Sequence, residues 1–249
     1  MSSRAFKFVD LFAGIGGFHF ALRAEGGQCV LAVERDEDCQ NIYRRAFGQT
    51  PLAGDICAIT RKPSGEARPL EEVAAIIPDH DLLCAGFPCQ PFSKSGSQEG
   101  IRDRTRGTLF HDVMTVAMAK KPKFVILENV RNLAGPRHRE TWQDIIDSLR
   151  GEGYLVSADP LILSPHRLSP TAGGTPQVRE RLFILAFRPD GPELLNPEPL
   201  LSRDLSAGWN PASWKIADHL DNDDSIENLE RFLLGEREVA WVDAWQAFV

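Results

Sequence analysis

The sequence predicts an α/β protein built on a doubly wound, mostly parallel sheet of seven strands, with a short helical appendage at its C-terminal end. Short apolar runs alternate with segments of helical periodicity up to about residue 188, which is the pattern of strands and covering helices in a parallel sheet. Glycines and prolines separate these runs. Because the composition changes after residue 188, we divide the chain into a main domain at 1–188 and an appendage at 189–249.

The expected strands are apolar runs of the kind that helices cover on both faces. They lie at residues 6–12, 29–33, a short segment closed by Gly54-Asp55-Ile56, 81–85, 124–127, 154–163 and 182–187. Between them, helices are expected through residues 20–22 up to Gly26-Gly27, through 42–46 to near Gly48, and at 70–77, 109–119 and 142–149. Loops are expected at 61–69, 93–107 and 164–176.

The appendage begins with a Pro-rich stretch at 189–212 and continues with two expected short helices, at 226–234 and 239–249. It holds four of the five tryptophans. The last helix is apolar over much of its circumference, so we expect it to bury against another surface.

Composition narrows the class of protein. No apolar run is long enough to cross a bilayer, and the N-terminal residues lack the apolar core of a signal peptide, so we expect a cytoplasmic protein with no membrane partner. The five cysteines are an odd number without a C-x-x-C pair, which argues against disulfides and against a metal site. The net charge of −7 divides into −9 for residues 190–249 and +2 for residues 1–189. An acidic balance weighs against nucleic-acid binding, but only for the tail.

The turn Gly14-Ile15-Gly16-Gly17 lies between the first strand and the first helix, where a ligand can approach backbone N–H groups. Glu34 follows twenty residues after Gly14, at the end of the second strand, where a carboxylate can grip ribose hydroxyls. The pair indicates a ligand with an adenosine-like half, although a tight turn without ligand remains an alternative. A nicotinamide-dependent oxidoreductase is a second alternative, but the third glycine of that pattern is replaced by His19.

A second motif, Gly86-Phe87-Pro88-Cys89-Gln90-Pro91-Phe92-Ser93, follows the fourth strand and holds one thiol between two prolines. Cys84 is expected to be a small buried hydrophobe, whereas Cys89 is placed like a nucleophile that needs nearby positive charge for activation. Glu128 ends the fifth strand, so it could face the same pocket. Arg179 and Arg181 lead into the seventh strand and could point to one side. The alternatives are a capping carboxylate and two solvated arginines.

These residues carry a resemblance to DNA (cytosine-5)-methyltransferases that use S-adenosylmethionine. Seven segments match in order over roughly residues 6–188. They are residues 10–18, Glu34, residues 54–56, residues 88–93, residues 106–110, residues 128–130 and residues 176–181. The resemblance implies a Rossmann-like methyltransferase domain at 1–188, with S-adenosyl-L-methionine as cofactor, S-adenosyl-L-homocysteine as product and no metal.

The resemblance also implies a cofactor site. Phe18 would stack on the adenine, Glu34 would hold the ribose, and Asp55 would accept from the adenine amino group. The cofactor-binding residues implied are Phe12, Gly14, Gly16, Gly17, Phe18, Glu34, Asp55, Ile56, Pro88, Thr108 and Leu109.

The implied reaction is methylation of cytosine carbon 5 in double-stranded DNA. Cys89 would attack carbon 6 of a flipped cytosine, Glu128 would hydrogen-bond ring nitrogen 3, Arg181 would contact the carbonyl oxygen of the base, and Arg179 would brace the nucleophile loop. The loop at 94–106 holds four bases and two acids and would close on DNA. The candidate DNA contacts are Gln90, Ser93, Lys94, Ser95, Arg102, Arg104 and Arg106.

The chain also departs from the family pattern. Arg35 stands where the family often has an aromatic residue, and no Gly-Asn dipeptide of the family's last motif occurs. The resemblance implies a target-recognition domain after the seventh strand, which we expect to be missing from this chain, with 189–249 similar to the linker before such a domain. We therefore expect either a truncated chain or the catalytic subunit of a split restriction-modification enzyme, inactive without a second polypeptide. A non-catalytic DNA-binding or regulatory subunit and an RNA cytosine-5 methyltransferase are the alternatives.

Overall fold

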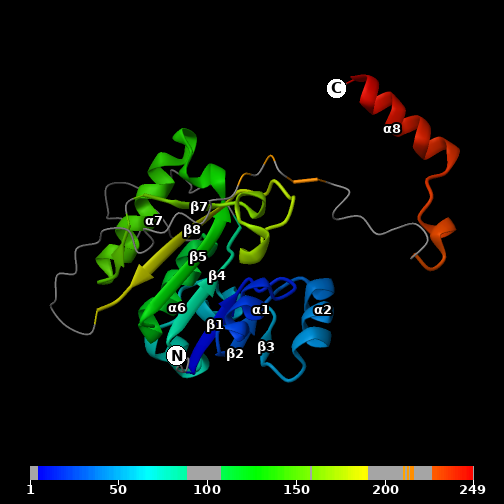
Figure 1. Cartoon of the computed structure of the whole chain (residues 1–249). Coiled ribbons are helices and arrows are strands. Elements are labelled where there is room, and N and C mark those ends of the chain that lie inside the picture. Colours follow the sequence, from blue (N-terminus) through cyan, green and yellow to red (C-terminus); the bar gives the residue numbers. More distant parts are fainter. Residues whose placement is uncertain are drawn as a thin grey trace.

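A computed structural model describes residues 5–88, 108–157, 159–189, 210, 212, 214–215 and 226–248. The described strands form one sheet, in the order β3-β2-β1-β4-β5-β8-β6, with β7 also pairing with β8 (Figure 1). Their bounds are β1 Phe6–Leu11, β2 Gly27–Val33, β3 Leu52–Ala53, β4 Leu82–Ala85, β5 Phe124–Val130, β6 Leu155–Val156, β7 Leu161–Leu163 and β8 Arg181–Phe187. The five strands from β3 to β5 are parallel, and β8 runs antiparallel to β5, β6 and β7.

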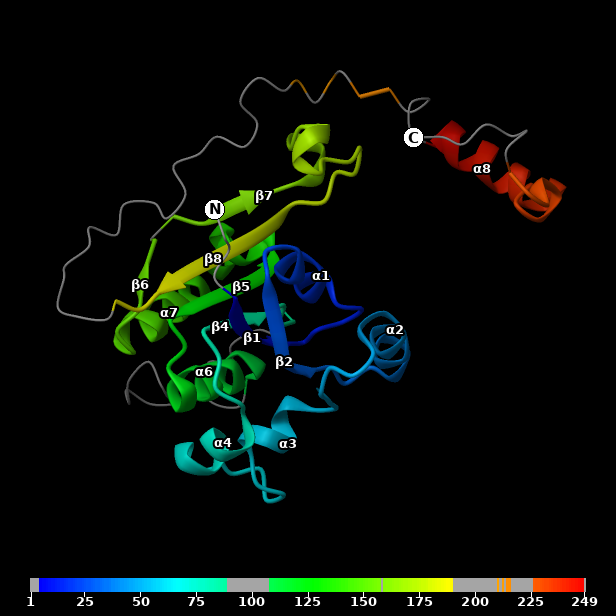
Figure 2. The same ribbon diagram turned by 60° about the horizontal axis from the view of Figure 1, so that its bottom comes forward.

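Helices cover both faces of the sheet (Figure 2). Residues of β1, β2, β4 and β5 alternate between two core clusters, one on each face. The larger cluster joins Val9 and Leu11 of β1 to side chains of α3, α4, α6 and α7. The smaller cluster joins Phe8 of the same strand to Tyr43 of α2 and, partly buried, to Phe18 and Leu22 of α1. The helices are α1 Gly17–Ala24, α2 Glu37–Phe47, α3 Ile56–Thr60, α4 Leu70–Ile76, α6 Leu109–Lys120, α7 Arg139–Gly151 and α8 Glu236–Phe248. The predicted doubly wound α/β class is confirmed.

The number of strands differs from the prediction, since the described part of the chain has eight strands rather than seven. The expected sixth strand at 154–163 divides into β6 and β7, and both pair with β8. Four residues, 157–160, separate the two strands, whereas only Ile184 and Leu185 separate their partners on β8. Pro160 has no N–H for the ladder, and the pairing with β8 resumes at Leu161. The expected seventh strand is β8.

The short third strand is also displaced from its expected position. It ends at Ala53 rather than at residues 54–56, and Ile56 begins α3. The cause is local, because the Asp55 carboxylate accepts a hydrogen bond from the backbone N–H of Cys57 at 2.9 Å and so caps α3.

The C-terminal appendage is less helical and less buried than expected. Between residues 226 and 234 only a 3-10 turn, Leu229–Arg231, forms after Asn228, which has a left-handed φ of 59°. Helix α8 forms, but it lies apart from the sheet in both views (Figures 1 and 2). Trp241 and Trp245 are 60% and 67% exposed, so the burial expected of this helix is not found. No helix in the described ranges is both long and apolar enough to span a bilayer.

Candidate functional site

The turn between β1 and α1 adopts a backbone that few residues other than glycine accept. Phe12, Gly14 and Gly16 have φ angles of 58°, 55° and 97°, and the Gly16 N–H donates to the Ala13 carbonyl at 2.8 Å. A Cβ added to Gly16 would lie only 2.1 Å from the ring of Phe47. Glycine at this position is therefore required by the packing of α2 and by the backbone conformation.

Glu34 lies directly against this turn. One oxygen of its carboxylate, Oε2, accepts from the backbone N–H of Gly14 at 2.7 Å, and Oε1 accepts from the N–H of Asp36 at 2.7 Å. Gly14 and Glu34, twenty residues apart in the chain, thus meet at the carboxyl ends of β1 and β2. A carboxylate has about four lone-pair positions, so Glu34 keeps acceptor capacity for further hydroxyl groups.

Asp10 lies on the core side of the same turn, and our reading of the sequence did not single it out. It is fully buried on β1, and its Oδ1 accepts from the Cys84 thiol at 3.6 Å. Its Oδ2 has no hydrogen-bond partner among the described residues. Burial raises the pKa of Asp10 to about 7, although the Cys84 thiol and the backbone N–H of His19 favour the ionised form. The sequence did contain a signal for Asp10, because it is the one acidic residue within the apolar run of the first strand.

The aromatic side chains near the turn differ in where they pack. Phe18 is half-buried on α1 and packs against the smaller core cluster. Phe12 is half-buried at the turn itself, directly after β1, and packs against the larger cluster. Both expected cofactor contacts are therefore partly exposed, and they pack against different core clusters.

Two helix N-termini complete this edge. Asp55 caps α3, and Thr108 caps α6 by accepting from the His111 N–H at 3.2 Å. Ile56 is buried in the larger cluster, and Leu109 packs partly against it. These four expected cofactor contacts come from the first residues of two helices that pack on the same face of the sheet.

The acidic end of β5 meets the end of β4 and the start of β8. Glu128 Oε1 lies 2.8 Å from Arg181 Nε, and each side chain is 25% exposed. A Cβ at Gly86 would lie 3.4 Å from Glu128 Oε2 and 3.9 Å from the carbonyl oxygen of Phe12. Gly86 therefore lies within a few ångströms of both the turn that follows β1 and the Glu128 carboxylate on β5.

Opposing effects set the protonation of Glu128. Burial raises its pKa, while the charges of Arg181 and Arg179 and the hydrogen bond from Arg181 lower it, with a net upward shift. Arg179 lies just before β8, where its backbone N–H donates to Ser164 Oγ at 3.0 Å. Glu180, between the two arginines, instead pairs with Arg131 at 2.5 Å and Arg167 at 3.4 Å.

Several expected site residues lie outside the described part of the chain. They are Cys89, Gln90, Ser93, Lys94, Ser95, Arg102, Arg104 and Arg106. The last described residue before them is Pro88, which is exposed, while Phe87 is buried and its carbonyl accepts from Asn129 Nδ2 at 2.8 Å. Cys84 is fully buried, in agreement with its interpretation as a core residue.

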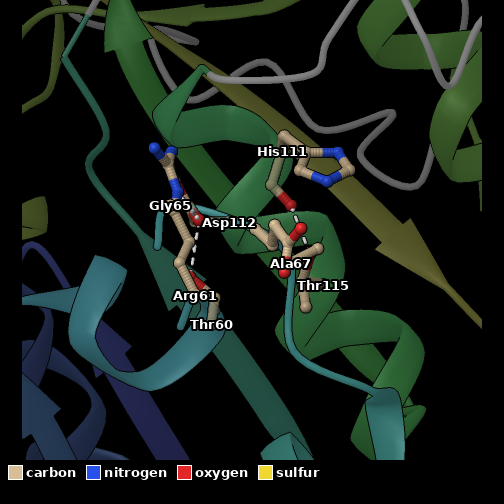
Figure 3. Close-up of a pocket in the computed structure, with 8 residues that line it drawn as sticks. Thr60, Arg61, Gly65, Ala67, His111, Asp112 and Thr115 are labelled. Atoms are coloured by element: carbon tan, nitrogen blue, oxygen red, sulfur yellow. Dashed lines mark hydrogen bonds and ion pairs between the residues drawn. The ribbon is translucent and has the colours of Figure 1, made fainter. Parts of the chain in front are cut away.

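A further polar cluster, which the sequence did not reveal, joins α3 to α6 behind the site (Figure 3). Asp112 of α6 is 1% exposed. It accepts from Arg61 Nε at 2.9 Å and from Thr60 Oγ1 at 2.5 Å, and it also forms an ion pair with Arg61 Nη2. The pair connects the two helices that begin at the cofactor-side residues Asp55 and Thr108.

Comparisons with known proteins identify related chains. The sequence model of the C-5 cytosine-specific DNA methylase family matches residues 6–237. The Type II methyltransferase M.AluI of Cellulosimicrobium cellulans is 41% identical over 273 aligned positions, covering 96% of this chain and 50% of the relative. M.HhaI of Haemophilus parahaemolyticus is 40% identical over 184 residues, covering 74% of this chain and 50% of the relative. The chain spans about half the length of these curated relatives.

A solved structure, the Dnmt2 methyltransferase of S. pombe, superimposes with a TM-score of 0.54 at 22% identity. The superposition covers 74% of this chain and 50% of that one. At this identity the likeness concerns the fold alone, and it agrees with the doubly wound sheet described above.

Proposed function

Because the chain belongs to the C-5 cytosine-specific DNA methylase family, we propose that it carries the cofactor-binding and catalytic machinery for methylating carbon 5 of cytosine in DNA. The observation that carries this proposal is the contact of Glu128 with Arg181 beside Gly86, next to the backbone of the glycine turn. This arrangement gives one carboxyl group and one guanidinium to a base at the sheet edge, where the nucleophile-bearing segment begins.

The charges around the turn support S-adenosyl-L-methionine as the cofactor. A turn of this kind often binds phosphate through free N–H groups at a helix N-terminus. Here the Glu34 carboxylate accepts from the Gly14 N–H, and the Asp10 carboxyl lies near the first turn of α1, where the His19 N–H favours its ionised form, so a pyrophosphate would meet two acidic side chains. This opposes a nicotinamide dinucleotide and favours an adenosine ligand that carries a positive charge. When bound, S-adenosyl-L-methionine supplies the electrophilic methyl group that carbon 5 of the activated base accepts.

Different residues of the chain would bind different parts of this ligand. Glu34 offers acceptors for ribose hydroxyls, and Asp55, at the start of α3, is the acceptor for the adenine amino group. Phe18 is the proposed adenine stack, and Phe12, which is half-buried like Phe18, is a further proposed contact. Gly14, Gly16, Gly17, Ile56, Pro88, Thr108 and Leu109 would line the rest of the site.

The proposed chemistry starts with addition of the Cys89 thiolate to carbon 6 of a cytosine flipped from the duplex. The ring electrons then move toward nitrogen 3, to which Glu128 donates a hydrogen bond. That donation requires a protonated carboxyl group, and the raised pKa of Glu128 favours it. After carbon 5 has accepted the methyl group, loss of its proton expels Cys89 and restores the aromatic ring. Arg181 would bind the carbonyl oxygen of the base, and Arg179 would support the loop that holds Cys89.

The remaining proposals concern the DNA and the rest of the enzyme. Residues 90–106 contribute the candidate backbone contacts, which basic side chains make through phosphate charge. We infer that residues 1–188 form the catalytic domain and that 189–249 lead toward a target-recognition region, in a restriction-modification context. The matched segment of the relatives is part of single chains about twice as long, so the comparisons give no support to a separate recognition subunit.

Covalent trapping tests the nucleophile. DNA containing 5-fluorocytosine retains the adduct, because fluorine cannot leave carbon 5 as a proton does. The full 249-residue chain with S-adenosyl-L-methionine should give a denaturant-stable protein–DNA band that Cys89→Ser abolishes. Cys39→Ser is the matched control, since Cys39 is a half-buried thiol on α2, and it should leave the band unchanged. Retention of the band in Cys89→Ser would refute the assignment.

A further inference from the structure

We propose that Asp10 is a specificity-determining residue of the cofactor site, whose buried carboxylate favours the positively charged sulfonium of S-adenosylmethionine over the neutral thioether of S-adenosylhomocysteine. The inference rests on the proposed function and deepens it, since it assigns to this chain a means of releasing its product in preference to its substrate. The experiment below separates failure of this inference from failure of cofactor binding itself.

The position of Asp10 links it to the turn. Its Cα pairs with those of Ala32 and Cys84, so its side chain lies on the same face as theirs, in the smaller core cluster under α1 and α2. It precedes Phe12 by two residues, and the backbone N–H of His19 in the first turn of α1 stabilises its ionised form. The carboxylate therefore lies between the strand and the helix that the cofactor turn connects.

No cationic group compensates this carboxylate within the described structure. The titratable groups that act on it come from each neighbouring element: the Cys84 thiol of β4, which donates to it, and, through charge, Cys29 of β2, Tyr43 of α2 and Glu34 after β2, while α1 contributes the backbone N–H of His19. Burial raises the pKa values of the Cys29 thiol, to about 12, and of the Cys84 thiol and the Tyr43 hydroxyl, so all three stay neutral near pH 7. Burial, with a smaller effect of Arg23, lowers the pKa of His19, which favours its neutral form.

An ionised Asp10 is therefore a buried anion whose Oδ2 has no partner among the described residues, in surroundings that are otherwise neutral or acidic. Burying such a charge without a counter-ion is costly, and the cost is reduced when a cation binds nearby. A ligand with a sulfonium supplies that cation, and the same ligand without its methyl group does not. When a carboxylate and a sulfonium lie within one site, their attraction changes the affinity for the charged ligand by roughly tenfold.

The coupling runs in both directions. If a cationic ligand favours ionised Asp10, its binding must also lower the pKa of Asp10, which lies at about 7 in the free protein. Binding of S-adenosylmethionine near pH 7 should then release protons, and its affinity should rise as the pH increases through 7. Binding of S-adenosylhomocysteine should do neither through Asp10.

The test compares affinities by isothermal titration calorimetry at pH 6 and pH 8, with the full chain, the Asp10→Asn variant and the Asp144→Asn control. Asp144 is a second buried aspartate, on α7, on the far side of β5 from the turn. The ligands are S-adenosylmethionine, S-adenosylhomocysteine and sinefungin, which carries a protonated amine in place of the sulfonium. Titration of the ligands' own amino groups cancels when the two proteins are compared.

We expect Asp10→Asn to lower the preference for the two cationic ligands over S-adenosylhomocysteine by about tenfold at pH 8 and by little at pH 6. Asp144→Asn should behave as the wild type. Equal weakening of all three ligands by Asp10→Asn would overturn the proposal and leave Asp10 a merely structural residue. If Asp10→Asn does not fold, the wild-type titration repeated in two buffers of different ionisation enthalpy decides, and the absence of excess proton release with the cationic ligands refutes the proposal. Failure of every ligand to bind the wild type would overturn the proposed function as well.

Discussion

The ion pair between Arg61 and Asp112 allows a prediction about stability that depends on which partner is removed. Asp112 is 1% exposed, whereas the Arg61 side chain is 25% exposed. Replacing Arg61 by methionine keeps the aliphatic stem but leaves Asp112 as a buried charge whose remaining donors are Thr60 and, at 3.8 Å, the Cys57 thiol. Breaking a buried pair in this way costs about 3–5 kcal/mol. Asp112→Ala instead leaves a guanidinium that can turn toward water, at a cost of about 1–3 kcal/mol.

Urea unfolding of the two variants and of the double variant measures both numbers and their coupling. A loss of 3–5 kcal/mol would lower the melting temperature by about 6–20 °C in a protein of this size. The matched control is Arg68→Met, because the Arg68–Glu72 pair at 3.3 Å joins side chains that are 26% and 46% exposed, and such a pair contributes about 0–1 kcal/mol. The reasoning is refuted if Asp112→Ala costs as much as Arg61→Met, or if Arg68→Met costs as much as either.

Three further predictions concern the site. Gly16→Ala should cost about 1–3 kcal/mol of stability and weaken cofactor binding, because Gly16 has a φ of 97° and the added Cβ would strike Phe47. Gly17→Ala is the control. No atom lies within 4 Å of its added Cβ, so it should leave the melting temperature nearly unchanged. Glu128→Gln should lower methyl transfer by at least about 100-fold while the calorimetric affinity for S-adenosylhomocysteine stays unchanged. Since burial raises the pKa of Asp10 from 3.8 to about 7, its contribution to stability is fully present below about pH 4 and is lost as the pH rises through 7. Urea unfolding should therefore show Asp10→Asn gaining stability relative to the wild type from pH 5 to pH 8.

Patterns in the sequence predicted those parts of the fold that depend on residues close together in the chain. The apolar runs identified β1, β2, β4, β5 and β8, because a strand covered on both faces has no polar periodicity to obscure it. The division of 154–163 into β6 and β7 depended on Pro160 opposite a continuous partner strand, and that pairing is not visible in the local sequence. Asp55 was assigned to the third strand although it caps α3. The strand has only two residues and ends at Ala53, two positions before the cap, so the sequence does not separate the two elements.

Parts of the site could be predicted for a topological reason. Glu128 and Arg181 meet because Glu128 lies two residues before Val130, the last residue of β5, and Val130 pairs with Arg181 at the start of the antiparallel strand β8. The strand continues two residues past Glu128, which the sequence had placed at its end. The Arg61–Asp112 pair joins residues 51 positions apart on two helices, and no motif marks either member. Similarly, the apolar residues of α8 indicate a surface that could be covered, but they do not specify what covers it.

The acid in β1 shows why a glycine turn alone identifies a ligand poorly. In its sequence, the segment from Gly14 to Gly17 is compatible with binding a dinucleotide phosphate or an adenosine ligand without phosphate. We propose that charge separates the two, because Glu34 accepts from the Gly14 N–H and Asp10 lies near the first turn of α1. A helix N-terminus is a site for anions only while its donors are free. With the Glu34 carboxylate already at the Gly14 donor, the proposed preference for a cationic ligand follows from residues outside the glycine motif.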